Sequence, residues 1–241
     1  MPVLGVVGAR GRLGSAVSSA ATDLGWRIGL TADREAWAVS ERPDAVVDAS
    51  HRTAIADVVR FCAEHRVPLV HATSGLQHAD DRLLTDLAGV VAVVRAPNLA
   101  LGHHLQTEVL LRLAALMAER PDERCELSVA ERHPTTKRDR LSATARALAT
   151  TWQGAGGEVA SIDSVRGGLR VSDHTVTLVI GDEELVVTHA VRSLSAPAVR
   201  AVQAAEWART AAPGRYSMST VYLAGGPAAL REVDEGSVIG C

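Results

Sequence analysis

Short apolar segments alternate with segments of helical periodicity through the first hundred residues. The apolar runs lie at residues 3–7, 26–30, 44–49, 67–70 and 89–95. Runs of this length are typical of strands that are buried on both faces of a sheet. The segments between them, at residues 12–24, 53–66 and 76–87, carry apolar positions at helical spacing. This alternation predicts an α/β fold with a doubly wound parallel sheet.

The pattern changes near residue 99. A long helical segment at residues 99–118 is followed by a strand at 125–130, a helix from 142, strands at 159–166, 175–180 and 184–191, and a helix at 197–209. Strands in succession predict an open, mainly antiparallel sheet of an α+β domain. We therefore expect a first domain at residues 1–98, completed by about residues 213–241, and a second domain at residues 99–212.

The first apolar run leads directly into three glycines, Gly8, Gly11 and Gly14. Gly8 ends the strand, Gly11 lets a pyrophosphate approach the backbone, and Gly14 lets the following helix lie close to the strand. The N-terminus of that helix would attract phosphates. An ordinary glycine turn is the alternative, but the flanking strand and helix favour a Rossmann-like dinucleotide-binding domain. The same turn would bring three further side chains to the cofactor, those of Arg10, Arg12 and Leu13.

Asp33 and Arg34 follow the second predicted strand. An acidic residue at this point binds the ribose hydroxyls of NAD in dinucleotide-binding folds. A neighbouring arginine can pair with the 2′-phosphate of NADP. The pair is therefore consistent with either NADH or NADPH, whereas two solvated charges in a turn are the alternative.

Polar and small residues follow the next predicted strands. Ligands of doubly wound sheets bind beyond the carboxyl ends of the strands. Each of these segments alone would pass for an ordinary turn, but together they predict a rim around a nicotinamide ring. The residues expected there are Ala49, Ser50, Ala72, Thr73, Gly75, Ala96, Pro97 and Asn98.

The segment at residues 131–145 is the densest in reactive side chains. A polar loop carries His133 and Lys137, and Ser142 and Thr144 open the next helix. An imidazole can donate a proton near neutral pH, a lysine can balance a carboxylate, and a helix N-terminus binds anions. A helix cap beside a solvated basic loop explains the same residues equally well.

Composition excludes several other classes. The net charge of −3 and the aromatic content of 3% argue against nucleic acid as a partner. Three separated cysteines favour a reducing, cytoplasmic location. Neither a membrane-length apolar run nor a signal peptide is evident, so we expect no membrane partner. We also expect no metal site, because the nine histidines include no His-Glu-x-x-His pattern.

These motifs resemble the dihydrodipicolinate reductase family over roughly residues 3–223. The glycine turn, residues 33–34, 72–75 and 96–102, and the segments around residues 166, 173–176, 188–189 and 216–218 all match. The segment from 131 is similar to the family's Glu-x-His-His-x-x-Lys-x-Asp-x-Pro-Ser-Gly-Thr-Ala. The resemblance implies a homotetramer that transfers hydride from NADH or NADPH to a cyclic imine dicarboxylate. It places His133 and Lys137 at catalytic positions, and Ser142, Ala143 and Thr144 at the substrate carboxylate.

Three positions in this segment depart from the family pattern. Pro134 replaces the second histidine, Leu141 replaces proline, and Ala143 replaces glycine. Because these changes fall on the expected substrate side, we expect Pro134 to border a modified substrate pocket. The resemblance thus implies an NAD(P)H-dependent reductase of 4-hydroxy-tetrahydrodipicolinate or a related imine. A non-catalytic protein that binds the nicotinamide dinucleotide is the alternative.

Overall fold

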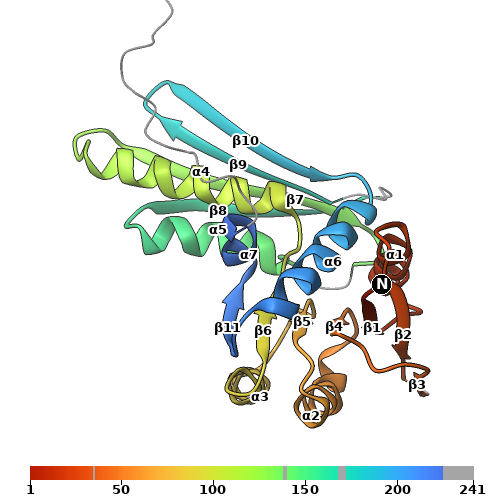
Figure 1. The fold of residues 1–241 in the computed structure, drawn as a ribbon. Coiled ribbons are helices and arrows are strands. Elements are labelled where there is room, and N and C mark those ends of the chain that lie inside the picture. The colour runs from red at the N-terminus through yellow and green to blue at the C-terminus, as the bar shows by residue number, and fades with distance from the viewer. Residues whose placement is uncertain (35, 138–139, 168–171, 225–241) are drawn as a thin grey trace, which may run out of the picture.

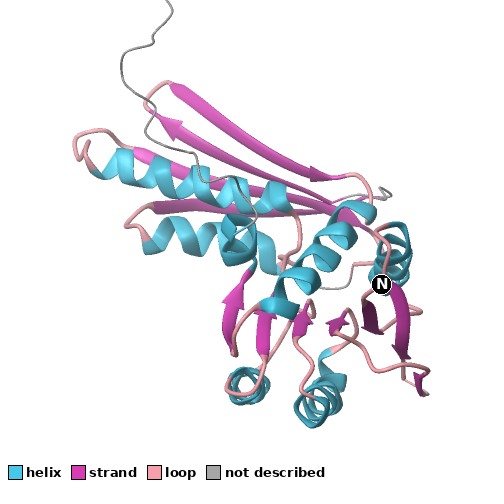
Figure 2. Ribbon diagram, in the orientation of Figure 1, coloured by secondary structure: helices cyan, strands magenta, loops and turns pink. Residues whose placement is uncertain are grey.

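Two sheets organise the chain in the computed structural model, which describes residues 1–34, 36–137, 140–167 and 172–224 (Figures 1 and 2). In the described residues the first sheet has seven strands in the order β11-β6-β5-β4-β1-β2-β3. All neighbours are parallel except β2 and β3. The strands are β1 (Val3–Val7), β2 (Arg27–Ala32), β3 (Trp37–Val39), β4 (Ala45–Asp48), β5 (Leu69–His71), β6 (Ala92–Arg95) and β11 (Gly214–Ser217).

Helices cover both faces of this sheet (Figure 1). Helices α1 (Arg12–Asp23) and α6 (Ser195–Thr210) share one apolar core with it. Helices α2 (Ile55–His65) and α3 (His78–Ala88) share the core on the other face, and a 3-10 turn (Arg52–Ala54) precedes α2. Strands β1, β4 and β5 are buried along their whole length, as their mostly apolar sequences predict, although β4 ends in Asp48 and β5 in His71.

The second sheet has the strand order β10-β9-β7-β8. Strand β9 runs antiparallel to β7 and β10, whereas β8 runs parallel to β7. Two helices and three strands of this sheet form a third core. The strands of this sheet and the two helices packed on it are α4 (Leu101–Ala118), β7 (Cys125–Pro134), α5 (Ala143–Gly154), β8 (Glu158–Gly167), β9 (Ser172–Ile180) and β10 (Glu183–Val191). All of them except β10 contribute to the third core. The sequence prediction of an α/β fold with a second, mainly antiparallel sheet is confirmed.

Two local features differ from the sequence prediction. Strand β3 was not predicted, because its three residues are all exposed and leave no burial pattern. Strand β7 continues to Pro134, so His133 lies in a strand and not in the expected polar loop. The tail expected to complete the first domain lies outside the described residues beyond 224, where α7 (Met218–Ala224) ends. No helix in the described residues has the length and apolar character needed to cross a lipid bilayer.

The first glycine turn is tightly packed between β1 and α1. Gly8 has a φ of +81°, and a Cβ there would lie 2.7 Å from the carbonyl oxygen of Ala49. A Cβ at Gly14 would lie 2.1 Å from the carbonyl oxygen of Gly8. The helix can therefore approach the strand this closely only without side chains at these positions.

We expect Gly14→Ala to lower the free energy of unfolding by about 1–3 kcal/mol, because backbone atoms must move to admit the methyl group. Denaturant unfolding of the purified variant measures this change. Gly154→Ala is the matched control, since a Cβ there meets no atom within 4 Å. Equal stability of the two variants would contradict the close packing of α1 on β1.

Candidate active site

The buried carboxylate of Glu131 on β7 is surrounded by the polar side chains of the second sheet. Leu127, Val129, Glu131 and His133 alternate along β7 and point to the buried side. Glu131 is 2% exposed. Its Oε1 accepts hydrogen bonds from the Ser164 hydroxyl (2.8 Å) and from Nη2 of Arg166 (3.0 Å). The backbone N–H of Ser142 donates to Oε2 (2.9 Å), which joins α5 to the sheet.

These bonds determine the charge of Glu131. Burial alone would raise the pKa of this carboxyl, but hydrogen bonds from Ser142, Ser164 and Arg166 outweigh burial and lower the pKa to about 2. Glu131 is therefore an anion at neutral pH. Its negative charge is available to the imidazoles beside it.

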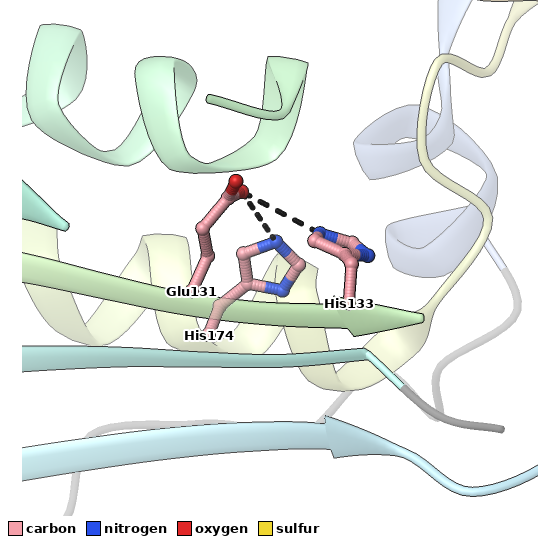
Figure 3. A group of neighbouring side chains, drawn as sticks. All are labelled: Glu131, His133 and His174. Atoms are coloured by element: carbon pink, nitrogen blue, oxygen red, sulfur yellow. Dashed lines mark ion pairs between the residues drawn. The ribbon is translucent and has the colours of Figure 1, made fainter. Parts of the chain in front are cut away.

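Two histidines face this anion from neighbouring strands (Figure 3). Nε2 of His133 on β7 lies 3.4 Å from Oε2 of Glu131, and Nε2 of His174 on β9 lies 3.8 Å from the same oxygen. Burial, assisted by the neighbouring His133, lowers the pKa of His174 to about 4. His174 is thus neutral at pH 7, and its Nε2 lies 3.1 Å from the Ser142 hydroxyl oxygen.

The same three side chains place possible metal ligands within 4.8 Å of one another. However, the carboxylate of Glu131 already accepts the three hydrogen bonds described above. One of them comes from the guanidinium of Arg166, whose positive charge would repel a cation. The cluster is therefore an ion-pair network around Glu131 and is not suited to hold a metal ion.

The N-terminus of α5 connects this network to the first sheet. Ser142 is the N-cap, and its hydroxyl oxygen accepts the N–H of Ala145 (3.1 Å). Asn98, beyond the end of β6, donates from Nδ2 to the hydroxyl oxygen of Thr144 (3.1 Å). Because Thr144 accepts this bond, its hydroxyl hydrogen can be donated to a ligand.

A cavity of about 220 Å³ lies where the two sheets meet. His133, His174 and His189 line it from the second sheet, and Thr144 lines it from α5. Burial lowers the pKa of His189 as well. The sequence-predicted residues that line this cavity are Leu13, Ala72, Ala96, Pro97, Asn98, His133 and Thr144.

A larger cavity of about 800 Å³ lies beyond the ends of β1, β2 and β4. Asp33 forms an ion pair with Arg10 there, with Nε and Oδ2 2.8 Å apart. Gly11 is the N-cap of α1, and a Cβ there would meet only the Gly8 carbonyl oxygen, at 3.0 Å. This turn fits a pyrophosphate. The sequence-predicted residues that line the cavity are Gly8, Arg10, Gly11, Asp33, Arg34, Ala49 and Ser50.

The remaining sequence-predicted residues are not among those that line these two cavities. Thr73 is buried, and Gly75 has a φ of +74°. Lys137 is half-buried, and its N–H donates to the carbonyl oxygen of Pro134. Arg12 and Gly14 lie in the first turn of α1, and Ser142 and Ala143 open α5.

Sequence reasoning assigned no role to Glu131, Ser164, Arg166 or His174. One signal was present in the sequence: Leu127 and Val129 occupy alternate positions, and Glu131 and His133 continue the same alternation, so they fall on the same face of the strand. The contacts between β7, β8 and β9 that complete the network depend on strand pairing, which the sequence does not specify.

Comparisons with known proteins agree with this architecture. The family model for the N-terminus of dihydrodipicolinate reductase matches residues 3–99, and the model for its C-terminus matches residues 102–222. A 4-hydroxy-tetrahydrodipicolinate reductase of Granulibacter bethesdensis is 29% identical, covering 90% of this chain and 95% of the relative. One from Alkaliphilus oremlandii is 26% identical, covering 88% and 95%.

A solved structure has the same fold. The dipicolinate-bound dihydrodipicolinate reductase of a Paenisporosarcina species superposes with a TM-score of 0.66 at 15% identity, covering 90% of this chain and 97% of that one. The two family models together span both sheets and both cavities. The chain therefore belongs to the dihydrodipicolinate reductase family and is an NAD(P)H-dependent oxidoreductase of that type.

Proposed function

We propose that the protein reduces the C=N bond of a small cyclic imine carboxylate, which is 4-hydroxy-tetrahydrodipicolinate or a related imine. One observation carries the proposal: His133, beside the Glu131 anion, shares a cavity with Asn98 and Thr144 at the ends of the parallel strands. A proton donor and an anion-binding helix N-terminus thus border the same space. A non-catalytic dinucleotide-binding protein would not need this combination.

A nicotinamide bound there would supply hydride to the imine carbon, and the nitrogen of the imine would gain a proton. His133 is the proposed donor, directly or through a water molecule. Its Nε2 faces Glu131, so the carboxylate stabilises the protonated imidazole. Lys137 balances a substrate carboxylate. Ser142, Ala143 and Thr144 bind that carboxylate at the start of α5, where N–H groups and the helix dipole favour an anion.

The proposed dinucleotide lies across the N-terminus of α1. Gly11 lines the larger cavity and Leu13 lines the smaller one, so this turn borders both. An adenosine in the larger cavity and a nicotinamide near Ala72 and Asn98 would place the pyrophosphate on the glycine turn.

We propose that both NADH and NADPH are accepted. Asp33 is suited to ribose hydroxyls, but its ion pair with Arg10 offsets the negative charge that would repel a 2′-phosphate. Arg34 is exposed and lines the same cavity, so its guanidinium can reach that phosphate.

The substrate pocket supports a substrate with less negative charge than the dicarboxylate. The described residues that line the smaller cavity include no arginine or lysine. Pro134 also offers no side-chain donor where the family pattern has a second histidine. We therefore propose an imine with one carboxylate as the preferred substrate.

The division into domains at residues 1–98 and 99–212 stays a proposal, as does a homotetramer.

Val165, Val179 and Val186 are exposed apolar residues on three strands of the second sheet and would suit contact between copies. A cytoplasmic location remains a prediction from the cysteines.

We expect Arg34→Ala to raise the dissociation constant for NADPH by about tenfold, because a charge-assisted hydrogen bond is lost, while that for NADH changes little. Fluorescence titration with each dinucleotide measures both constants. Arg112→Ala, which removes an exposed arginine from α4, controls for net charge. Equal losses for the two dinucleotides would remove Arg34 from the phosphate site.

We expect His133→Ala to lower kcat by about 10²–10⁴-fold, the usual contribution of a positioned proton donor. Thr144→Val is expected chiefly to raise KM for the imine, and Thr144→Ser to restore it. Steady-state kinetics separate the two effects, with the exposed His78→Ala as a control for histidine loss. An unchanged kcat in His133→Ala would contradict the mechanism.

The substrate assignment is tested by following oxidation of the dinucleotide with a panel of imines. The panel contains fresh 4-hydroxy-tetrahydrodipicolinate beside pyrroline and piperideine carboxylates. We expect kcat/KM to be about tenfold or more higher for a monocarboxylate, because the described residues of the pocket walls offer no fixed cation to a second carboxylate. A preference for the dicarboxylate, with rescue of a strain that lacks the reductase, would refute this part.

A further inference from the structure

A buried acid–base pair lies outside the site described above, in the parallel sheet. Asp48 ends β4 and His71 ends β5, and the two residues are register partners in adjacent strands. Both side chains are 0% exposed. Nδ1 of His71 lies 2.8 Å from Oδ2 of Asp48.

The other carboxylate oxygen of Asp48 holds the turn that follows β4. Oδ1 accepts the backbone N–H of Ser50 (3.0 Å) and also the Ser50 hydroxyl. One oxygen therefore faces His71 while the other faces Ser50. Ser50 lines the larger cavity.

The pair lies beneath the loops that border both cavities. The backbone of Ala49 and Ser50 lies against Gly8, at 2.7 and 2.8 Å from the place of a Cβ on that glycine. The N–H of Ala72 donates to the carbonyl oxygen of Asp48, and that of Ala96 donates to the carbonyl oxygen of His71. A shift of Asp48 would therefore move the turn that packs against the glycine loop.

Burying such a pair is costly, and apolar residues of similar size could fill the same space. The surrounding strand residues Val46, Val47, Leu69 and Val70 are all apolar and fully buried. Stability alone therefore does not account for a carboxylate and an imidazole at these two strand ends. Their contacts lead to the cofactor side of the sheet.

We propose that His71 is a positioning residue for dinucleotide binding. Through the 2.8 Å contact of its Nδ1 with Oδ2, it holds the Asp48 carboxylate in place, and Asp48 in turn holds the turn at residues 49–50 against the glycine loop. His71 lines neither cavity, so it acts through Asp48. The proposal rests on the proposed dinucleotide site but is independent of the imine and of His133.

Two variants, each with a side chain smaller than histidine, test this role. His71→Val removes the donor, whereas His71→Asn places an amide nitrogen at the distance of Nδ1 from Cβ. We expect the valine variant to raise the dissociation constants for NADH and NADPH by about tenfold or more, since the buried polar contact with Asp48 is lost. The asparagine variant should remain within about threefold of the wild type, because its donor persists.

Val70→Ala is the control for general loosening of β5, because Val70 is fully buried in the same strand. It should lower thermal stability and leave dinucleotide affinity unchanged. Equal affinity losses in Val70→Ala and His71→Val would overturn the positioning role, and so would wild-type affinity in His71→Val. If His71→Val does not fold, His71→Gln replaces it, because the amide nitrogen of glutamine lies at the distance of Nε2 from Cβ and not at that of Nδ1. Wild-type affinity in His71→Gln would likewise overturn the positioning role.

The KM for the imine at saturating dinucleotide separates this proposal from the proposed function. We expect this KM to change by less than about twofold in His71→Val, because the substrate side is untouched. A large rise in this KM, with unchanged dinucleotide affinity, would overturn the positioning role. A wild-type protein that binds the dinucleotide but reduces no imine would overturn the proposed reaction and leave the role of His71 intact.

Discussion

The buried anion of Glu131 is the constraint on which the second half of the molecule depends. A carboxylate at this depth is tolerable only if its oxygens are hydrogen-bonded, and the donors come from two elements, the N-terminus of α5 and strand β8. Satisfying Glu131 therefore sets the start of α5 against β7 and β8. The same charge faces His133, so the packing requirement and the proposed chemistry are met by one group.

The two sheets contribute different parts of the proposed reaction. The parallel sheet presents its strand ends and the N-terminus of α1, where a dinucleotide fits. The second sheet presents histidines and the N-terminus of α5. The hydrogen bond from Asn98 to Thr144 joins these two sides at the edge of the smaller cavity. Any movement between the sheets would therefore alter the distance between the hydride donor and His133.

The sequence predicts the central parallel strands well because β1, β4, β5 and β6 are mostly apolar runs that need no long-range information. It also locates the glycine turn, Asp33 and the start of α5, since each depends on local backbone requirements. His133 was placed in a loop because the inward positions of β7 turn polar at Glu131. The contacts of Arg166, His174 and His71 could not be predicted, because each depends on which strands are neighbours.

The central claim is that hydride passes from a nicotinamide to the carbon of a C=N bond in this cavity. The most direct measurement uses a reduced dinucleotide in which both hydrogens at C4 of the nicotinamide are deuterium, with the preferred imine in ordinary water, and NMR of the product. The account predicts deuterium at the former imine carbon and none at nitrogen-exchangeable positions. Dinucleotide binding without any labelled amine product would contradict it and favour a non-catalytic protein.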